Sequence, residues 1–227
     1  LKEILAAQAG VTLGTGENGN AFGDRYIIRG HEARSDVFVD GLRDPGMTTR
    51  ESFATQQVEI TKGPSSTFAG RGSSGGAVNS ITKKASTAYD FGRVDLSVGT
   101  DDHHRVVVDY NTPIATNLAT RINLLSTEED APNREGIGRS RQGILLSGLY
   151  DNTDDLRIYS DLYYLKAEDT PDLGSYLDSD TKTPVENIPV YAQSNDFLDS
   201  EVARMWDISF SEEINLIFKI FAKQSKF

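Results

Sequence analysis

The sequence predicts a mainly β protein in which a small mixed α/β unit precedes a meander of antiparallel strands. Up to about residue 84, short strand-like runs are separated by glycine-rich turns, and beyond residue 87 apolar and polar side chains alternate in longer runs. Charge changes at the same place: residues 1–87 hold ten Lys/Arg and nine Asp/Glu, whereas residues 88–227 hold thirteen and twenty-five. We therefore expect two domains, residues 1–87 and residues 88–227.

The first domain is expected to combine short strands with few helical turns. A helix is predicted over residues 1–9 and should end at Gly10, and residues 14–23 should form a glycine-rich loop. Strands are expected at 26–28, 36–40, 57–61 and 76–82, with a turn at Asp44-Pro-Gly and helical turns within 49–55.

The second domain contains seven alternating runs of roughly ten residues, a length that suits a tilted membrane strand. The apolar residues of each run share one parity: Val94, Leu96 and Val98; Val106, Val108 and Tyr110; Leu118, Ile122 and Leu124; Ile144, Leu146 and Tyr150; Leu156, Ile158, Leu162 and Tyr164; Val202, Trp206, Ile208 and Phe210; Ile214, Leu216, Phe218 and Ile220.

The connections between these runs alternate in length. Those at 111–117, 151–155 and 211–213 are short, whereas those at 128–140 and 168–200 are long and polar, and 100–103 is a short exception on the second side. Short turns on one rim and long loops on the other are typical of an outer-membrane barrel. Seven strands would form only part of such a barrel. A soluble β-sandwich shows the same alternation, so alternation alone leaves both architectures open.

Composition excludes several classes of function. The 227 residues include no cysteine, which excludes disulfides and thiolate metal sites. A net charge of −11 argues against a nucleic-acid partner, because binding phosphates requires a basic face. The start Leu1-Lys-Glu-Ile-Leu lacks the pattern of a secretory signal peptide, and no run of 18 apolar residues predicts a membrane helix.

No catalytic or metal-binding constellation is visible, so we expect no enzyme activity. Gly70-Arg-Gly-Ser-Ser-Gly75 fits the spacing of a dinucleotide-binding loop, but strand formers rather than a helix follow it, and Pro64 interrupts the approach. His103 and His104 are neighbours that should point to opposite faces of a strand. The acidic residues between 172 and 186 lack the ligand order of a calcium loop.

Three segments carry a family resemblance. They are Tyr26-Ile-Ile-Arg-Gly30, Asp36-Val-Phe-Val-Asp-Gly-Leu-Arg-Asp44 and Gln57-Val-Glu-Ile-Thr-Lys-Gly-Pro-Ser-Ser-Thr-Phe-Ala-Gly-Arg-Gly-Ser-Ser-Gly-Gly-Ala-Val-Asn-Ser-Ile-Thr-Lys83. In this order and spacing they resemble the plug domain of TonB-dependent outer-membrane receptors, especially the branch that imports ferric catecholate siderophores. The residues that carry the plug motif are Arg29, Gly30, Asp40, Gly41, Glu59, Lys62, Gly63, Pro64, Gly70, Arg71, Gly72, Gly75, Gly76 and Asn79.

The resemblance implies a plug followed by the first strands of a barrel that closes with about 22 strands in this family. It implies three partners: a ferric siderophore, the TonB energy-coupling complex acting on a segment before Leu1, and the lipid of the bacterial outer membrane. No cofactor is expected, since iron belongs to the siderophore ligand. A receptor for another cargo, such as cobalamin, haem or a glycan, and a soluble β-rich binding module remain the alternatives.

The resemblance also suggests ligand residues. It places the turn from Leu42 to Arg50 at a plug apex that faces outward, which makes Arg43 and Arg50 candidates, because guanidinium forks suit an anionic, oxygen-rich chelate. The alternative is that both arginines pair with nearby acids, such as Asp40, Asp44 and Glu51.

Aromatic faces for catechol rings are expected from Tyr159, Tyr163 and Tyr191, and ordinary packing is the alternative. Arg71 and Glu59 are expected to form an ion pair within the plug or against the barrel.

Overall fold

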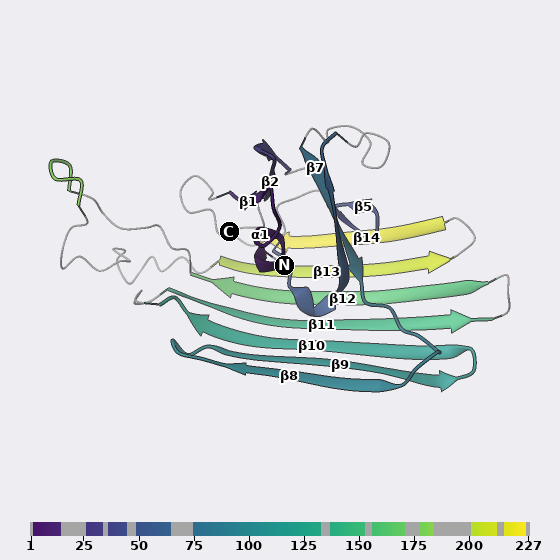
Figure 1. Cartoon of the computed structure of the whole chain (residues 1–227). Helices are drawn as coiled ribbons and strands as arrows, with labels where there is room; N and C mark the ends of the chain where they lie inside the picture. The colour runs from purple at the N-terminus through teal and green to yellow at the C-terminus, as the bar shows by residue number, and fades with distance from the viewer. Residues whose placement is uncertain are drawn as a thin grey trace.

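The computed structural model describes residues 2–14, 26–33, 36–44, 49–64, 75–132, 137–152, 156–170, 178–183, 201–212 and 216–225. The described strands form three sheets, and two small sheets stand on one face of a long seven-stranded sheet (Figure 1). We call residues 2–86 the N-terminal unit. The face of the seven-stranded sheet that it contacts is the inner face, and the opposite side is the outer face.

The first small sheet follows a short helix, α1 (Lys2–Ala6). It contains β1 (Val11–Leu13), β2 (Tyr26–Ile28) and β3 (His31–Glu32), in that order. Gly10 separates α1 from β1 with φ of +78°, a left-handed conformation that glycine adopts without strain. Leu5, Tyr26 and Ile28 are almost completely buried, and they form the centre of this part of the core.

The second small sheet contains β4 (Val37–Val39), β5 (Leu42–Arg43), β6 (Thr55–Lys62) and β7 (Gly76–Thr82), in the order β5-β4-β7-β6. The central pair β4 and β7 is parallel, and a 3-10 turn, η1 (Ser52–Ala54), leads into β6. Central parallel strands are covered on both faces, which explains their apolar residues. Gly76 is required because a Cβ atom there would lie 2.0 Å from the Thr61 carbonyl oxygen.

The remaining strands form one antiparallel meander in chain order. They are β8 (Phe91–Val98), β9 (His104–Ala115), β10 (Leu118–Asp130), β11 (Gly138–Asp151), β12 (Arg157–Asp169), β13 (Glu201–Glu212) and β14 (Leu216–Ser225). The N-terminal unit stands above the middle of this sheet in Figure 1.

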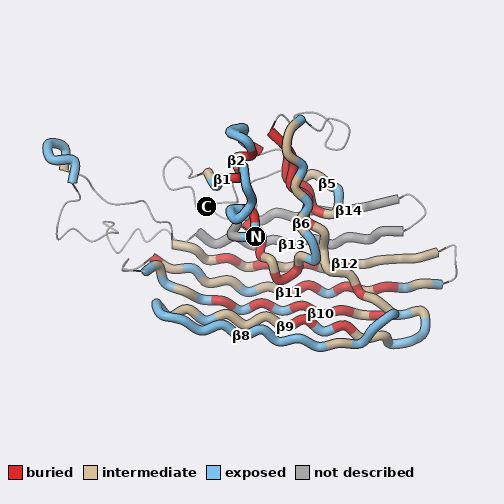
Figure 2. The backbone as a smooth tube through the Cα atoms, viewed as in Figure 1, coloured by how far each residue is buried: buried red, intermediate tan, exposed pale blue. Residues whose placement is uncertain are grey.

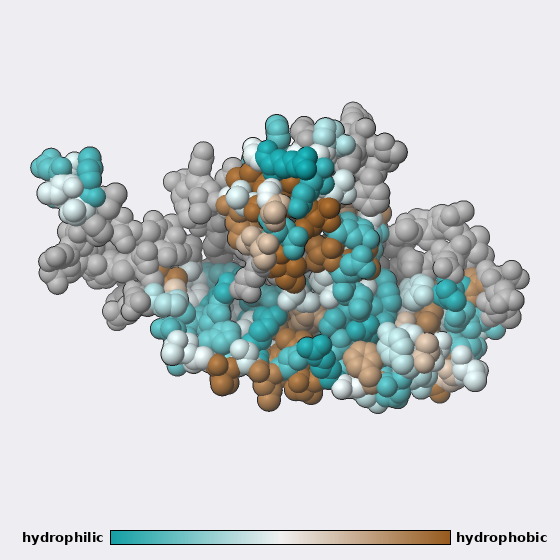
Figure 3. Space-filling model, in the orientation of Figure 1, coloured by the Kyte–Doolittle hydropathy of each residue, from teal (hydrophilic) through white to brown (hydrophobic). Residues whose placement is uncertain are grey.

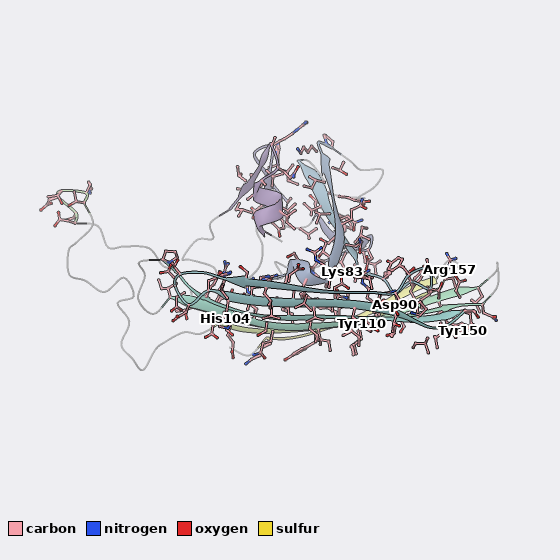
Figure 4. All side chains as sticks on the ribbon, turned by 60° about the horizontal axis from the view of Figure 1, so that its bottom comes forward. Lys83, Asp90, His104, Tyr110, Tyr150 and Arg157 are labelled. Carbon is pink, nitrogen blue, oxygen red and sulfur yellow. The ribbon has the colours of Figure 1, made fainter. Side chains whose placement is uncertain are left out.

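The two faces of the sheet differ in chemistry. Buried positions follow the strands beneath the N-terminal unit, and many of them are polar (Figure 2). On the outer face Val94, Leu96, Val98 and Ile114 are more than half exposed, and apolar side chains line the lower edge in Figure 3. Figure 4 places Lys83 on the side of the N-terminal unit and Tyr110 and Tyr150 on the other side. The alternation in the sequence therefore corresponds to a polar inner face and an apolar outer face.

The expected fold class is confirmed. The strands expected at 26–28, 36–40, 57–61 and 76–82 correspond to β2, β4, β6 and β7, and the seven alternating runs correspond to β8–β14. The helix over residues 1–9 is shorter than expected, ending at Ala6. The strands β1, β3 and β5 escaped prediction because two or three residues are too few to show a periodicity.

The architecture also separates the alternatives. The seven runs form a single sheet instead of the two layers of a sandwich, and β7 instead of a nucleotide-binding helix follows Gly75. The expected domain boundary at residue 87 lies between the end of β7 at Thr82 and the start of β8 at Phe91. In the part of the chain that the structure describes, no helix is both long and apolar enough to cross a membrane.

Candidate functional site: the contact between the N-terminal unit and the sheet

The segment that follows β7 is fixed to the inner face by two lysines. Lys83 Nζ lies 2.8 Å from Asp109 Oδ2 of β9 and 3.2 Å from Asn123 Oδ1 of β10. Lys84 forms a close ion pair with Asp161 of β12. Two consecutive residues thus reach three strands of the sheet.

The backbone of the same segment is bound to the inner face as well. The Ala85 N–H donates to Ser147 Oγ at 3.1 Å, and the Ser86 N–H donates to Asn111 Oδ1 at 2.9 Å. The amide of Asn111 in turn donates to the carbonyls of Ser86 and Tyr89. An asparagine side chain offers both a donor and acceptors, so Asn111 replaces the strand partner that this segment lacks.

Arg121, the fourth residue of β10, joins the sheet to the N-terminal unit. Its Nε and Nη2 each donate to the carboxylate of Asp109 at 2.8 Å, and its Nη1 reaches Gln56 Oε1 at 3.3 Å and the Lys84 carbonyl at 3.1 Å. The planar guanidinium suits this forked arrangement. Since Asp109 also holds Lys83, one buried carboxylate compensates two cations.

Glu51, directly before η1, is the acid that the N-terminal unit presents to the sheet. Its Oε2 lies 3.1 Å from Arg105 Nη2 of β9, and its Oε1 pairs closely with Arg141 Nη1 of β11. Arg141 also donates to Asp169 of β12, at 3.3 Å from Nε and 2.6 Å from Nη2. Because the Glu51 side chain is only 9% exposed, the two guanidiniums take the place of water around its carboxylate.

The electrostatics of Glu51 follow from these contacts. Burial alone raises the pKa of its carboxyl, but the charge and hydrogen bond of Arg141 and the charge of Arg105 outweigh burial and lower the pKa below its ordinary value. Glu51 is therefore ionised at neutral pH, and its attraction to the sheet depends on that charge.

One aromatic side chain supplies the main apolar contact. The Phe53 ring of η1 stacks on Tyr163 of β12, with 5.7 Å between ring centroids and 23° between planes. It lies over Gly143, where a Cβ atom would come within 2.6 Å of the Phe53 Cζ atom. The same buried cluster contains Ala54, Leu125, Leu145 and Leu165. Glycine in β11 thus leaves the space that the ring occupies.

A small polar pocket lies in this contact, with a volume of about 30 Å³. Arg50, Glu51 and Ser80 line it from the N-terminal unit, and Asp161 and Tyr163 line it from the sheet. Within the described residues, Nη2 of Arg50 and Oγ of Ser80 are buried without a protein hydrogen-bond partner. The pocket is polar and large enough for about one water molecule, which would satisfy such atoms.

The two arginines expected to bind ligand lie in different environments. Arg50 is buried, and its Nε donates to Asp44 Oδ2 at 3.0 Å, as the pairing alternative expects. Arg43 is 36% exposed, lies 5.2 Å from the centroid of the Phe38 ring and is 3.6 Å from Asp36 Oδ1. Burial raises the pKa of the Asp36 carboxyl, and the charge of Arg43 offsets only part of that rise. The ligand role of both arginines stays a prediction, and Arg43 is the more accessible of the two.

The tyrosines expected to bind catechol rings are separated. Tyr163 is buried against Phe53, which is the packing alternative. Tyr159 is half-buried, with Lys84 Nζ 5.9 Å from its ring centroid. Tyr191 lies outside the described residues. Their role in ligand binding stays a prediction.

The Arg-Gly and Asp-Gly pairs of the plug motif form two-residue hairpin turns. Arg29 and Gly30 connect β2 to β3, and Asp40 and Gly41 connect β4 to β5. All four residues have positive φ, between 49° and 82°. Tight hairpins of this kind require two successive left-handed residues, and glycine at the second position lowers the strain. The carboxylate of Asp40 also accepts from the Thr82 N–H at 2.8 Å.

Asn79 connects the second small sheet internally. Its Oδ1 accepts from the Gly41 N–H, and its Nδ2 donates to Glu59 Oε2, both at 3.0 Å. Glu59 therefore has a described partner within the N-terminal unit. Arg71, the partner expected from the sequence, lies outside the described residues, as do Gly70 and Gly72.

The ends of the glycine loop are described and closely packed. β6 ends at Lys62, and the Gly63 N–H donates to the Gly75 carbonyl at 2.8 Å, after which Pro64 is exposed. A Cβ atom at Gly75 would lie 2.5 Å from the Ile28 carbonyl oxygen. Gly75 is needed because two backbones approach each other closely there.

The histidines do not converge. His103 Nδ1 lies 2.8 Å from Glu129 and its Nε2 lies 3.1 Å from Ser97 Oγ, whereas His104 is 3.6 Å from Glu128. Across the described ranges, no three His, Cys, Asp or Glu side chains are grouped so that they could hold a metal ion.

Sequence reasoning missed the residues that make the contact itself: Glu51, Phe53, Lys83, Lys84, Arg105, Arg121 and Arg141. The sequence did contain a signal for the three arginines of the sheet. Arg105, Arg121 and Arg141 occupy inward positions in alternating strands, and a charge at a position that becomes buried implies a partner from elsewhere in the chain. No sequence pattern identified the partner.

Comparisons with known proteins agree with this arrangement. Residues 1–77 match the family described as TonB-dependent Receptor Plug Domain. The chain is 36% identical over 186 residues to the probable TonB-dependent receptor BfrD of Bordetella pertussis, covering 82% of this chain and 25% of that protein. It is 38% identical over 181 residues to the probable TonB-dependent siderophore receptor PiuA of Acinetobacter baumannii, covering 79% and 24%. The chain thus spans about a quarter of the length of these relatives.

Solved structures show the same fold. The siderophore receptor PiuA from Acinetobacter baumannii superposes with a TM-score of 0.78 at 32% identity, covering 92% of this chain and 30% of that one. The closed form of the ferric-catecholate import receptor Fiu from Escherichia coli K12 superposes with a TM-score of 0.79 at 26% identity, covering 95% and 32%.

Replacing Phe53 by Ala should loosen the N-terminal unit from the sheet. Removing a buried ring typically costs about 3–5 kcal/mol, and here the loss falls on the contact. We expect faster protease cleavage of the N-terminal unit in the full-length protein. Phe38→Ala is the matched control, since Phe38 is equally buried but packs on Ala77 within the unit. Equal cleavage of Phe53→Ala and the wild type would show that the ring does not fasten the unit.

Replacing Glu51 by Gln should weaken the contact in a pH-dependent way. At neutral pH the loss should be about 3 kcal/mol, because Arg105 loses its acid and Arg141 loses one of its two acids. The pKa of Glu51 lies below the ordinary carboxyl value of about 4.3, so its contribution is complete above that pH and is lost as the pH falls through the lowered value.

Chemical denaturation of the full-length protein should therefore show the largest difference between wild type and Glu51→Gln at neutral pH, shrinking in acid. The exposed Glu59, which is bonded to Asn79, provides the control variant Glu59→Gln. A difference that stayed constant below about pH 4 would contradict the role of the Glu51 charge.

Proposed function

We propose that the whole protein, a member of the TonB-dependent receptor family, imports a ferric siderophore across the bacterial outer membrane. This chain comprises the plug domain and the first strands of the barrel of that receptor. The N-terminal unit is the plug, and the seven-stranded sheet is part of the barrel wall. The chain is thus a piece of an outer-membrane receptor, in which the cargo crosses by displacement of a plug.

The observation that carries the proposal is the polar contact between plug and wall. Lys83, Lys84 and Glu51 of the plug pair with acids and arginines of the wall. A contact of this kind can be exchanged for water when the plug moves, because charged groups are well solvated, whereas a large apolar contact would resist opening. The apolar outer face, which also carries Tyr110 and Tyr150, suits contact with lipid.

The cargo is inferred from chemistry and from the relatives. PiuA is named a siderophore receptor, and Fiu, 32% identical over 160 residues, is named a catecholate siderophore receptor. An iron chelate with catecholate oxygens is anionic, and accessible arginines suit it. Of the two candidate arginines, Arg43 is the more accessible, and Arg50, Tyr159, Tyr163 and Tyr191 remain further candidates.

The energy source is proposed from the family. TonB-dependent receptors work with the TonB complex of the inner membrane, and we infer that TonB acts on the N-terminal side of the plug. The protein then serves as a gated carrier and carries out no bond chemistry. Its named relatives are receptors, which supports this view.

A second cargo class is favoured by one comparison. Over 80 residues the chain is 42% identical to the metal-pseudopaline receptor CntO of Pseudomonas aeruginosa, covering 34% of this chain. A metal-pseudopaline complex is therefore the second candidate cargo.

Uptake in cells tests the proposal. The full-length protein, produced in a strain that lacks its own siderophore receptors, should take up radioactive iron from a ferric catecholate siderophore, and deletion of tonB should abolish uptake. Cobalamin, haem and a hydroxamate siderophore serve as control cargoes. Uptake that persisted without TonB, or that was limited to cobalamin or haem, would contradict the proposal.

A further inference from the structure

Two arginines of the wall converge on a single carboxylate of the plug. Arg105 and Arg141 lie in one row of the sheet, because each is paired in register with Thr127 of the intervening strand β10. Both side chains reach over Thr127 to Glu51, one to each carboxylate oxygen. The wall therefore contains an anion site made of two guanidinium groups, and the Glu51 carboxylate of the plug is bound in it.

The two arginines differ in what they would retain without Glu51. Arg141 would keep its ion pair with Asp169, which belongs to the wall itself. For Arg105, Glu51 is the one acid within ion-pair distance among the described residues. Withdrawal of Glu51 would thus leave a local charge of about +1, from two guanidiniums and one carboxylate.

The other cations at the contact lack this property. Arg121 is held through its Nε and Nη2 by Asp109 of the wall and needs no acid from the plug. Lys83 and Lys84 belong to the plug rather than to the wall, and their partners in the wall are acids. Arg105 and Arg141 are therefore the pair that plug movement would leave short of negative charge.

We propose that Arg105 and Arg141 form a latent anion site on the inner wall, which Glu51 occupies while the plug is seated and which an anionic, oxygen-rich cargo occupies once the plug has moved. This rests on the proposed function and deepens it. The chemistry of the site is that of a carboxylate, and catecholate or carboxylate oxygens of a metal chelate offer the same negative oxygens to the guanidinium donors.

The position of the pair fits passage of a cargo. Arg105 is the second residue of β9, Arg141 the fourth residue of β11, and Asp169 the last residue of β12. The pair thus lies toward the end of the sheet where the long connections at 131–137 and 170–200 join the strands. A cargo that entered from that rim would meet this pair before it met Arg121 and Asp109 deeper in the wall.

A binding measurement tests the site without transport. In the full-length protein purified in detergent, Glu51→Gln removes the competing carboxylate and should expose the arginines to an added anion. Calorimetric titration with inorganic sulfate should reveal one site more than in the wild type, at least about tenfold tighter than any wild-type binding there. The double variant Glu51→Gln/Arg105→Gln should lose that site, and Glu51→Gln/Arg139→Gln should keep it. Arg139 is the matched control because its ion pair is with Glu129 of the wall.

Equal sulfate binding by the wild type and Glu51→Gln would overturn the proposal, and so would a gained site that survives Arg105→Gln. Retention of heat-modifiable barrel behaviour verifies that each variant is folded. If Glu51→Gln fails to fold, Glu51→Ala with the same two arginine variants gives the same comparison.

A transport measurement separates passage from structural support. Arg105→Gln should slow uptake of the ferric siderophore by about tenfold while surface binding in the cold stays unchanged, and Arg105→Lys should restore part of the rate. A merely structural arginine would loosen the plug and raise the entry of a large antibiotic such as vancomycin without slowing uptake, which would contradict the proposal. If the wild type imports no ferric siderophore, the proposed function fails, and the sulfate titration still decides whether the anion site exists.

Discussion

The arrangement of this chain depends on one electrostatic constraint: ionised side chains are covered on the inner face of a sheet, and each of them needs an opposite charge or a hydrogen-bond partner there. Arg121 and Asp109 satisfy each other within the wall, but Asp161, Arg105 and the second carboxylate oxygen of Asp109 also receive partners from the plug. The wall and the plug are therefore complementary in charge before any cargo is considered. Separating them requires water, or another ion, to take over these contacts.

The plug is held to the wall by two kinds of contact, one apolar and one ionic. The cluster around Phe53 is apolar, compact and shaped by the absence of a side chain at Gly143, so it fixes where the plug sits. The ion pairs surround that cluster and set how readily the plug leaves. The core of the plug, which includes Leu5, Tyr26 and Val78, is a separate cluster, so loss of the wall contact does not by itself expose it. A plug that has its own core and is held to the wall by polar contacts can leave the wall without unfolding.

Much of the fold could be predicted from sequence, because its signals are local. Alternation predicted the seven strands and both faces of the sheet, whereas the hairpins at Arg29-Gly30 and Asp40-Gly41 escaped prediction because β3 and β5 are too short to show a periodicity. The contact residues were harder, because an ion pair such as Glu51 with Arg141 joins positions 90 residues apart, and no periodicity relates them. Phe53 illustrates the same limit: its role depends on a glycine in a distant strand. Arg50 shows that residue type alone does not distinguish a ligand residue from a structural one, since its Nε donates to Asp44 within the N-terminal unit.

Charge pairs hold the plug to the wall, and a double-mutant cycle on Lys84 and Asp161 tests this most directly. Lys84→Met, Asp161→Asn and the double variant would be compared in the full-length protein by hydrogen exchange of the amides that follow β7, which report detachment of this segment. We predict a coupling energy of about 1.5–3 kcal/mol, with the double variant exchanging more slowly than the sum of the single losses implies. Strictly additive losses would contradict the account, because they would mean that the two charges do not hold plug and wall together.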